Sequence, residues 1–319
     1  MGVLSALKGI NESFHILSQI TKSTSNRVLT SIIFFKHVVR GAHYAPPRPI
    51  PSSIALPVYA KTGEVPNPPR EVEIKTKEQI DAVRSACQIA RKVAGHAKDF
   101  IKVGVTTEDL DSVLHHSIID YGAYPSPLNY KGFPKSVCTS VNNVAVHGIP
   151  DSYSLKDGDI ISVDISVYYG GVHGDLCETF LVGNVDDAGR KLVDISRKCL
   201  DSAICQCGPG VRFSTIGNTI SSLAKQHGFS VSPYCYGHGI GSVFHALPDI
   251  CHVANNYPGR MAPGMTFTIE PVIHEGSSGI QVLDDGWTMI ATDGKRASQF
   301  EETILITDSG IEILTQEQS

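Results

Sequence analysis

Features that would point to several other classes of protein are missing from this 319-residue chain. None of its eight cysteines forms a CxxC pair, so we expect no structural zinc knuckle and expect reduced thiols in an intracellular compartment. The net charge of −5 argues against nucleic acid as a partner. The apolar run over residues 28–39 is broken by Lys36 and His37 and is too short to span a membrane.

Acidic residues are almost absent from the first 43 residues, where five Lys or Arg residues accompany a single acid, Glu12. Serine and threonine are frequent in the same stretch. This composition is typical of an organelle transit peptide. We therefore expect residues 1–43 to direct the protein to mitochondria, with plastids, or a tail without any targeting role, as the alternatives.

Residues 44–70 contain eight of the 18 prolines and cannot form a continuous helix. We expect an extended linker that drapes over the following domain, although an SH3-type ligand has a similar composition. Residues 71–319 are expected to form one domain, because the hydrophobic content of 41% supports a full core. We expect the protein to be a monomer.

A duplicated pattern of helices follows the linker. Residues 76–79 have the form of a capping box ahead of a helical apolar stripe, and a second helix is expected over residues 107–121. The pattern returns at a constant offset of 106 residues, in which Ile89, Gly104, Leu110, Gly122 and Pro127 correspond to Ile195, Gly210, Ile216, Gly228 and Pro233. This register indicates two helix-helix-strand halves that pack pseudo-symmetrically, with a site in the seam.

A hairpin is expected in the first half. Residues 161–167 alternate strictly between apolar and polar side chains, residues 169–171 supply turn chemistry, and a second strand is expected over residues 173–182. Asp164 and Asp175 lie equally far from the turn, so we expect them opposite or nearly so, about 5 Å apart at Cβ. Two carboxylates this close repel each other unless a cation or a proton lies between them.

Three more residues that can bind metal ions lie in strand-like surroundings. His238 lies between two glycines, which let the backbone come close to whatever this histidine touches. Glu270 ends the alternating run 265–270, and Glu301 lies in an expected last strand over residues 300–307.

The charges of these residues predict a dinuclear centre. Burying unpaired carboxylates is costly. Two divalent cations balance the four acids, with neutral His238 as a fifth ligand, whereas one cation leaves two negative charges in excess. Oxygen and imidazole ligands without a thiolate suit Mn, Fe, Co or Zn.

The five residues resemble the metal ligands of the methionine aminopeptidases, and the likeness extends from about residue 71 to the C-terminus. It rests on the spacing Asp-x10-Asp, on Gly-His-Gly-Ile-Gly, Ile-Glu-Pro and Gln-Phe-Glu, and on the stretches 133–138, 141–143 and 147–150. The short interval between His245 and Glu270 resembles type 1 enzymes, and the transit-like start resembles the mitochondrial variant. The resemblance implies the α/β (α+β) pita-bread fold, in which two pseudo-symmetric halves form a curved antiparallel sheet with helices outside.

The resemblance also implies an activity and a role for each site residue. The activity is removal of the N-terminal methionine from nascent or newly made proteins, preferring a small uncharged second residue, so the partners are N-terminal peptides. Asp175 and Glu301 would bridge two divalent metals, Asp164 would chelate one of them, and His238 with Glu270 would hold the other. A bridging water or hydroxide would be the nucleophile and Glu270 the general base.

Further residues are implied around the reacting bond. His147 and His245 would bind the substrate and stabilise the oxyanion. The methionine side chain would lie in an apolar pocket, of which one or two members are expected to be ordinary core residues. That pocket comprises Tyr130, Phe133, Cys138, Phe244 and Trp287.

The sequence departs from the family at positions that are not ligands. Pro127 stands where bacterial members have a small Cys, Cys235 where an aromatic residue or Met is usual, and Glu302 where His is frequent.

Two other functions remain open. A Xaa-Pro aminopeptidase or prolidase shares the ligand pattern but usually has a large N-terminal domain, whereas only 27 residues, 44–70, precede the expected domain here. A relative that binds partners without catalysis usually loses metal ligands, and this chain has all five.

Overall fold

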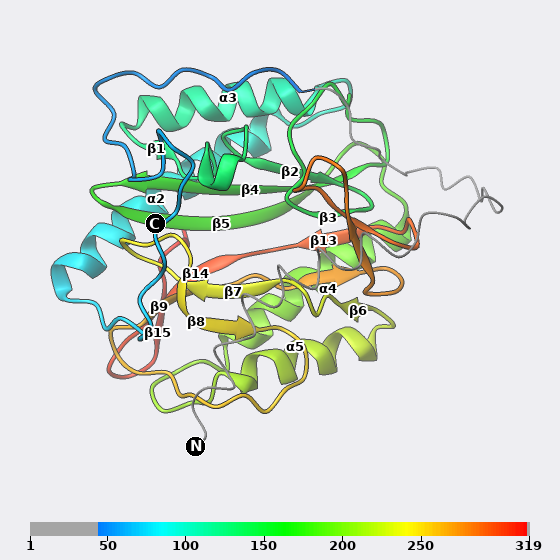
Figure 1. Cartoon of the computed structure of the whole chain (residues 1–319). Coiled ribbons are helices and arrows are strands. Elements are labelled where there is room, and N and C mark those ends of the chain that lie inside the picture. The colour runs from blue at the N-terminus through cyan, green and yellow to red at the C-terminus, as the bar shows by residue number, and fades with distance from the viewer. Residues whose placement is uncertain (1–43, 318–319) are drawn as a thin grey trace. The chain divides into compact units, whose positions relative to one another are not determined.

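The computed structural model describes residues 44–317, so the expected targeting segment 1–43 lies outside the described residues. The helices of this part are α2 (Lys77–Phe100), α3 (Thr107–Asp120), α4 (Asp187–Ile204) and α5 (Ser214–Gln226), with a 3₁₀ turn η2 at Tyr130–Gly132 (Figure 1). The strands are β1 (Tyr124–Pro125), β2 (Cys138–Val141), β3 (Val144–Val146), β4 (Ile160–Tyr169), β5 (Val172–Leu181), β6 (Ser230–Val231), β7 (Tyr236–Gly239), β8 (Ala246–Cys251), β9 (Thr266–Ile269), β10 (Val272–His274), β11 (Ile280–Val282), β12 (Met289–Ala291), β13 (Ala297–Gln299), β14 (Glu302–Ile306) and β15 (Ile311–Ile313).

The first two helices begin where the sequence predicts. The Thr76 side chain accepts from the backbone N–H of Gln79, and the Gln79 side chain accepts from that of Thr76, which confirms the capping box of α2. A second capping box, between Thr106 and Asp109, begins α3. Each box satisfies backbone donors that the first helical turn leaves without partners.

The strands pair antiparallel throughout the described part, in four hydrogen-bonded groups. The long strand β4 pairs with β5 along one edge and with β1 and β2 along the other. The largest group has the order β15-β14-β9-β7-β8. An isolated bridge between Cys177 of β5 and Glu301, just before β14, joins the two regions.

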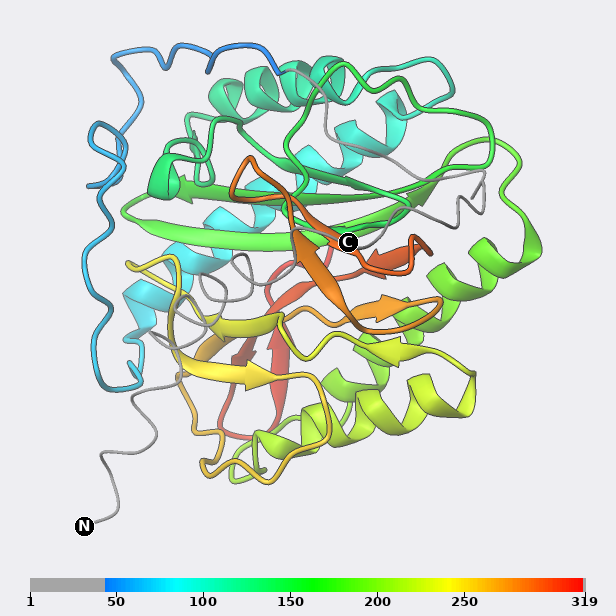
Figure 2. The same ribbon diagram turned by 45° about the vertical axis from the view of Figure 1, so that its right-hand side comes forward.

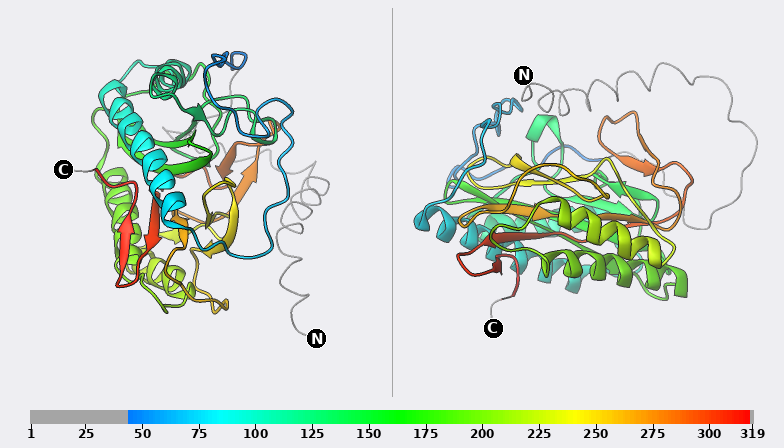
Figure 3. Two further views of the ribbon diagram at one scale, coloured as in Figure 1. Left: turned by 90° about the vertical axis from the view of Figure 1, so that its left-hand side faces the viewer. Right: turned by 90° about the horizontal axis from the view of Figure 1, so that it is seen from below.

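The helices cover one side of these strands (Figure 3). Helix α2 packs on β4 and β5 over one apolar cluster, while α4 and α5 lie side by side (Figure 2) over a second cluster. Leu110 and Ile216, which the repeat relates, are both fully buried. Burying a side chain of this size stabilises the fold by about 2 kcal/mol.

The 106-residue repeat holds in three dimensions. Gly104 N–H donates to the Leu155 carbonyl, and 106 residues later Gly210 N–H donates to the Met261 carbonyl, both at 2.8 Å. Gly104 and Gly210 have φ angles of 92° and 81°, a conformation that glycine adopts without strain. The same offset relates Asp164 of β4 to Glu270 at the end of β9. Each half therefore contributes one acid from an equivalent position.

The hairpin register refines the predicted placement of the aspartates. Asp164 pairs with Cys177, and Asp175 pairs with Ser166. The two aspartates are therefore diagonal neighbours on one face of the sheet rather than directly opposite each other, which still leaves their side chains within reach of one ion.

Residues 44–70 run over the domain without a regular helix or strand. Arg48 forms ion pairs with Glu108 and with the buried Asp111 of α3. Tyr59 is 3% exposed, and its hydroxyl donates to the Ser126 carbonyl at 2.6 Å. Within residues 44–317, no helix combines the length and the apolar character needed to cross a bilayer.

Candidate metal centre

The five residues with metal-binding side chains come from five different strands or strand ends. Ligand atoms of Asp175, His238 and Glu301 all lie within 4.8 Å of one another. His238 Nε2 is 3.8 Å from Asp175 Oδ2 and 3.6 Å from Glu270 Oε1. Asp164 lies beside Asp175, and their carboxyl groups are within hydrogen-bonding reach. The seam between the halves thus collects four carboxylates around one imidazole.

Burial controls the protonation of this cluster. It raises the pKa of Asp164 to about 6. It raises the pKa of Asp175 and Glu301 well above the usual range, and neighbouring carboxylates add to both shifts. Burial lowers the pKa of His238 to about 4, so this imidazole is neutral at physiological pH and free to act as a ligand.

Two oxygen atoms of the cluster test whether divalent cations fit. Asp175 Oδ1 and Glu301 Oε1 are buried and have no hydrogen-bond partner among the described residues. Leaving such an acceptor unsatisfied is costly, and native proteins rarely do so. Cations bound between these side chains would satisfy both atoms and offset the repulsion between the acids, so the residues present fit a divalent metal centre.

Side chains two positions from the acids orient them. Ser166 Oγ donates to Asp164 Oδ1 at 3.4 Å, and Thr268 Oγ1 donates to Glu270 Oε1 at 2.9 Å. Gln299, two residues before Glu301, donates from Nε2 to Glu270 Oε2 at 3.4 Å. The period of two along a strand could have identified all three supporting residues, because it places them on the face of the acids.

His252 supports the site in a way that sequence reasoning missed. Its Nε2 accepts from the backbone N–H of Glu270 at 3.1 Å, and its Nδ1 lies 3.1 Å from the Cys235 carbonyl. These contacts fix the backbone at Glu270 and leave Nδ1 as the protonated nitrogen. The spacing of the sequence gives no sign of this contact. His252 follows β8 and Glu270 follows β9, and only the fold brings the ends of these two strands together.

The glycines beside His238 let the backbone approach neighbouring chain segments closely. A Cβ on Gly237 would lie 2.3 Å from the carbonyl oxygen of Thr268, whose hydroxyl accepts from the His238 backbone N–H, and one on Gly239 would lie 2.0 Å from the carbonyl oxygen of Leu247. Neither position could therefore carry a side chain without displacing the neighbouring strand.

Of the two histidines expected to contact substrate, His245 lies directly beside the cluster. The His245 ring lies 4.2 Å from that of His238, and its Nδ1 is 2.9 Å from the Tyr130 hydroxyl. His147 has a φ of 56°, and its Nδ1 is buried without a hydrogen-bond partner among the described residues. Burial lowers the pKa of His147 to about 4, so the neutral ring has a free hydrogen-bonding nitrogen.

The five residues expected to hold a methionine side chain lie in two adjoining apolar clusters. Tyr130 and Phe244 pack edge to face at 5.1 Å in one, and Phe133 packs with Cys138 in the other. Trp287 contacts both clusters, at 5.2 Å from the Phe133 ring and 6.2 Å from the His147 ring. Apolar and aromatic side chains thus lie next to both His147 and His245.

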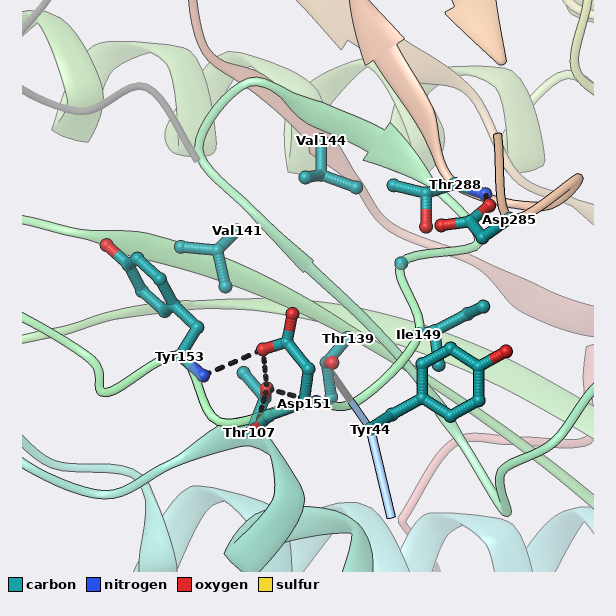
Figure 4. Close-up of a pocket in the computed structure, with 11 residues that line it drawn as sticks. Tyr44, Thr107, Thr139, Val141, Val144, Ile149, Asp151, Tyr153, Asp285 and Thr288 are labelled. Atoms are coloured by element: carbon teal, nitrogen blue, oxygen red, sulfur yellow. Dashed lines mark hydrogen bonds between the residues drawn. The ribbon is translucent and has the colours of Figure 1, made fainter. Parts of the chain in front are cut away.

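A separate pocket lies on the other face of β2 (Figure 4). It is lined by Thr139, whose neighbour Cys138 faces the opposite way, and by Asp151, which accepts hydrogen bonds from Thr107 and from the backbone of Tyr153. Its cavity volume of about 30 Å³ has room for water. None of the five candidate ligands and none of the residues expected to hold a methionine side chain lines it, so this pocket is separate from the candidate substrate site.

Residues 81–308 match the metallopeptidase family M24, and the chain belongs to this family. Over 290 residues it is 53% identical to a human protein named methionine aminopeptidase 1D, mitochondrial, with 91% of this chain and 85% of the relative covered. An Arabidopsis thaliana relative, named methionine aminopeptidase 1D, chloroplastic/mitochondrial, is 44% identical over 313 residues, covering 95% and 89% of the two chains.

A solved structure of methionine aminopeptidase from Rickettsia prowazekii has a TM-score of 0.76 at 38% identity, covering 77% of this chain and 100% of that one. Together these comparisons confirm the predicted pita-bread fold and the predicted enzyme class.

Proposed function

We propose that this chain removes the N-terminal methionine from newly made mitochondrial proteins whose second residue is small and uncharged. The observation that carries the proposal is the cluster of Asp175, His238 and Glu301, with buried unpartnered carboxylate oxygens, beside an aromatic apolar pocket. We also propose that the protein acts as a monomer.

We propose two divalent metal ions at this site, because four carboxylates carry the charge that two such ions balance. Asp175 and Glu301, whose ligand atoms lie close to that of His238, would serve both ions. Asp164 would complete one site, and His238 with Glu270 the other. Divalent cations held there activate water as a nucleophile near neutral pH and polarise the peptide carbonyl. Mn, Fe, Co and Zn all suit this donor set.

The side chains around the metals have separate tasks. Glu270, oriented by Thr268 and Gln299, would take a proton from the attacking water and pass it to the leaving amine. His147 and His245 can donate hydrogen bonds to the developing oxyanion, each worth about 10²- to 10³-fold in kcat. Their neutral rings make this possible without adding a charge to the pocket.

Substrate selectivity follows from the pocket beside the metals. Tyr130, Phe133, Phe244 and Trp287 offer ring faces and edges to an unbranched thioether side chain. Cys138 is buried, packs with Phe133 and pairs in the sheet with Asp164, so it would lie between the pocket and the acids.

Peptide cleavage separates this function from its alternatives. Metal-free protein, reloaded with Mn or Co, should release methionine from Met-Ala-Ser much faster than from Met-Leu-Ser and should leave Xaa-Pro peptides intact. Cleavage of Xaa-Pro peptides would select the prolidase alternative. Metal binding without any cleavage would select a non-catalytic relative.

We also propose that residues 1–43 are the mitochondrial targeting segment, with residues 44–70 as a linker and residues 71–319 as the catalytic domain. The basic, acid-poor composition of the first segment supports this division. A fusion of residues 1–43 to a fluorescent protein should enter mitochondria. A fusion that stays in the cytosol contradicts the proposal, and one that enters plastids selects the alternative destination.

A further inference from the structure

Glu302 is a buried acid next to a residue of the metal centre, but it faces away from that centre. It is 2% exposed and follows Glu301 directly. Because successive strand residues point to opposite faces, Glu301 points into the seam and Glu302 points toward the helices. A buried carboxylate needs partners, and the structure supplies them from both halves of the domain.

Two arginines converge on Glu302. Arg197 of α4 donates from Nη1 to Glu302 Oε1 at 3.0 Å, and Arg91 of α2 donates from Nη2 to Glu302 Oε2 at 3.2 Å. Thr315 near the C-terminus donates its hydroxyl to the same carboxylate. Arg91 also forms an ion pair with Glu178 of β5. Arg197, which is only partly buried, also forms an ion pair with Asp201 of its own helix. We call the network of Arg91, Glu178, Arg197, Glu302 and Thr315 the Glu302 clasp.

The two arginines occupy equivalent positions in the repeat. Arg91 and Arg197 are separated by 106 residues, the same offset that relates α2 to α4 and Asp164 to Glu270. The pseudo-symmetric halves thus present the same side chain to a single carboxylate. Glu302 lies where the halves meet, directly behind the seam that holds the metal centre.

Glu301 is consequently held from two sides. In front, its backbone N–H donates to the Cys177 carbonyl at 2.9 Å, which ties it to β5. Behind, the adjacent Glu302 ties the same strand to α2 and α4. A residue that would contact two metal ions tolerates little displacement, because the affinity of the site for metal falls steeply when a ligand group is misplaced.

We propose that Glu302 is a positioning residue for the metal centre, and that the Glu302 clasp holds Glu301 in place by joining β14 to the equivalent helices of both halves. The proposal rests on the role of Glu301 as a metal ligand given under Proposed function. It adds a residue that contacts neither metal nor substrate and acts through the strand that carries the ligand.

The test compares metal affinity in two variants of similar chemistry. Glu302→Gln keeps the size of the side chain but removes the charge that both arginines share. Glu312→Gln is the matched control, since it removes the carboxylate of the Arg84–Glu312 ion pair, which also links α2 to a C-terminal strand but does not touch the clasp. Metal-free full-length protein is titrated with Mn by calorimetry, well below the unfolding temperature of each variant.

We expect Glu302→Gln to bind Mn about 10- to 100-fold more weakly than the unmodified protein, as found when groups behind a ligand are removed. Glu312→Gln should bind with unchanged affinity, even if its unfolding temperature falls. Unchanged affinity in Glu302→Gln, or equal weakening in both variants, overturns the proposal. If Glu302→Gln does not fold, the Mn affinity of Arg197→Met is compared with that of Glu312→Gln instead. Arg197→Met should fold, because Arg91 still pairs with Glu302 in that variant.

A third variant separates this proposal from the assignment of Glu301 as a metal ligand, on which it depends. Glu301→Gln should lose metal affinity more severely than Glu302→Gln. If Glu301→Gln binds Mn as the unmodified protein does, the metal centre itself is wrongly assigned. If Glu301→Gln loses affinity but Glu302→Gln does not, only the positioning role fails.

Discussion

The protonation state of single side chains determines how tightly the site can bind metal ions. Asp164 has a pKa of about 6 in the folded protein, above its usual 3.8. A raised carboxyl pKa contributes stability that is present below the unfolded value and is lost as the pH rises through the folded value. In the metal-free protein, the contribution of Asp164 to stability is therefore lost between about pH 4 and about pH 6. Metal ions reverse this effect, because they favour the ionised form.

Metal affinity should accordingly rise with pH. A divalent ion must displace the proton of Asp164 below about pH 6, and the raised pKa of Asp175 and Glu301 adds to this competition. For each proton that the metal must displace, the metal affinity falls about tenfold for every unit by which the pH is lowered. His238, with a pKa of about 4, is already neutral and adds no dependence in this range. Calorimetric Mn titrations from about pH 5 to about pH 7 check this, and a flat profile contradicts it.

His147 should be needed for turnover but not for metal binding. Its ring contacts Trp287, and its buried Nδ1 is unpartnered among the described residues. We expect His147→Ala to lower kcat about 10²- to 10³-fold through loss of one oxyanion donor. Elemental analysis should show unchanged metal content. The exposed His116 supplies the control, since His116→Ala should behave as the unmodified protein. Metal loss in His147→Ala would make His147 a ligand.

At the scale of elements, α2 and the turn that follows it offer a matched pair of glycines. Gly95 lies in the interior of α2 and Gly104 lies four residues beyond its end, and an added Cβ meets nothing within 4 Å at either position. Only the backbone differs, because Gly104 has a φ of 92°. Gly95→Ala should stabilise the protein by about 0.5–1 kcal/mol, and Gly104→Ala should destabilise it by about 1 kcal/mol or more.

Urea unfolding of the two metal-free variants measures these free energies side by side. Opposite signs support the assigned backbone conformations. Stabilisation by both substitutions would mean that the chain at Gly104 does not need a left-handed residue.

The elements also show which contacts a sequence can predict. Capping residues and strict alternation are local patterns, and a constant offset can be read directly from the sequence, so α2, α3, the β4–β5 hairpin and the repeat were predictable. Register between strands that no short turn connects is set by packing of the whole domain. For that reason the contact of His252 with Glu270, and the convergence of Arg91 and Arg197 on Glu302, were not predictable. The diagonal placement of Asp164 and Asp175 required the exact hairpin register.

At the scale of the whole described domain, the seam between two related halves is the site. Positions related by the 106-residue offset supply Asp164 and Glu270, and Asp175, His238 and Glu301 complete the cluster. The duplicated helices close the back of the seam, and the aromatic residues line its front. This arrangement explains how strands from distant parts of the sequence bring four acids together, and why the cluster in its ionised form needs bound cations.

Counting bound metal ions tests the dinuclear centre most directly. Calorimetric titration of the metal-free protein, with elemental analysis of the product, should give two divalent ions per chain. Asp164→Asn should bind only one with high affinity, because His238, Glu270 and the shared oxygens of Asp175 and Glu301 still complete the other site. Its folding should be retained and its activity should fall strongly. An unmodified protein that never binds more than one ion, or an Asp164→Asn variant that binds two with unchanged affinity and activity, would contradict the account.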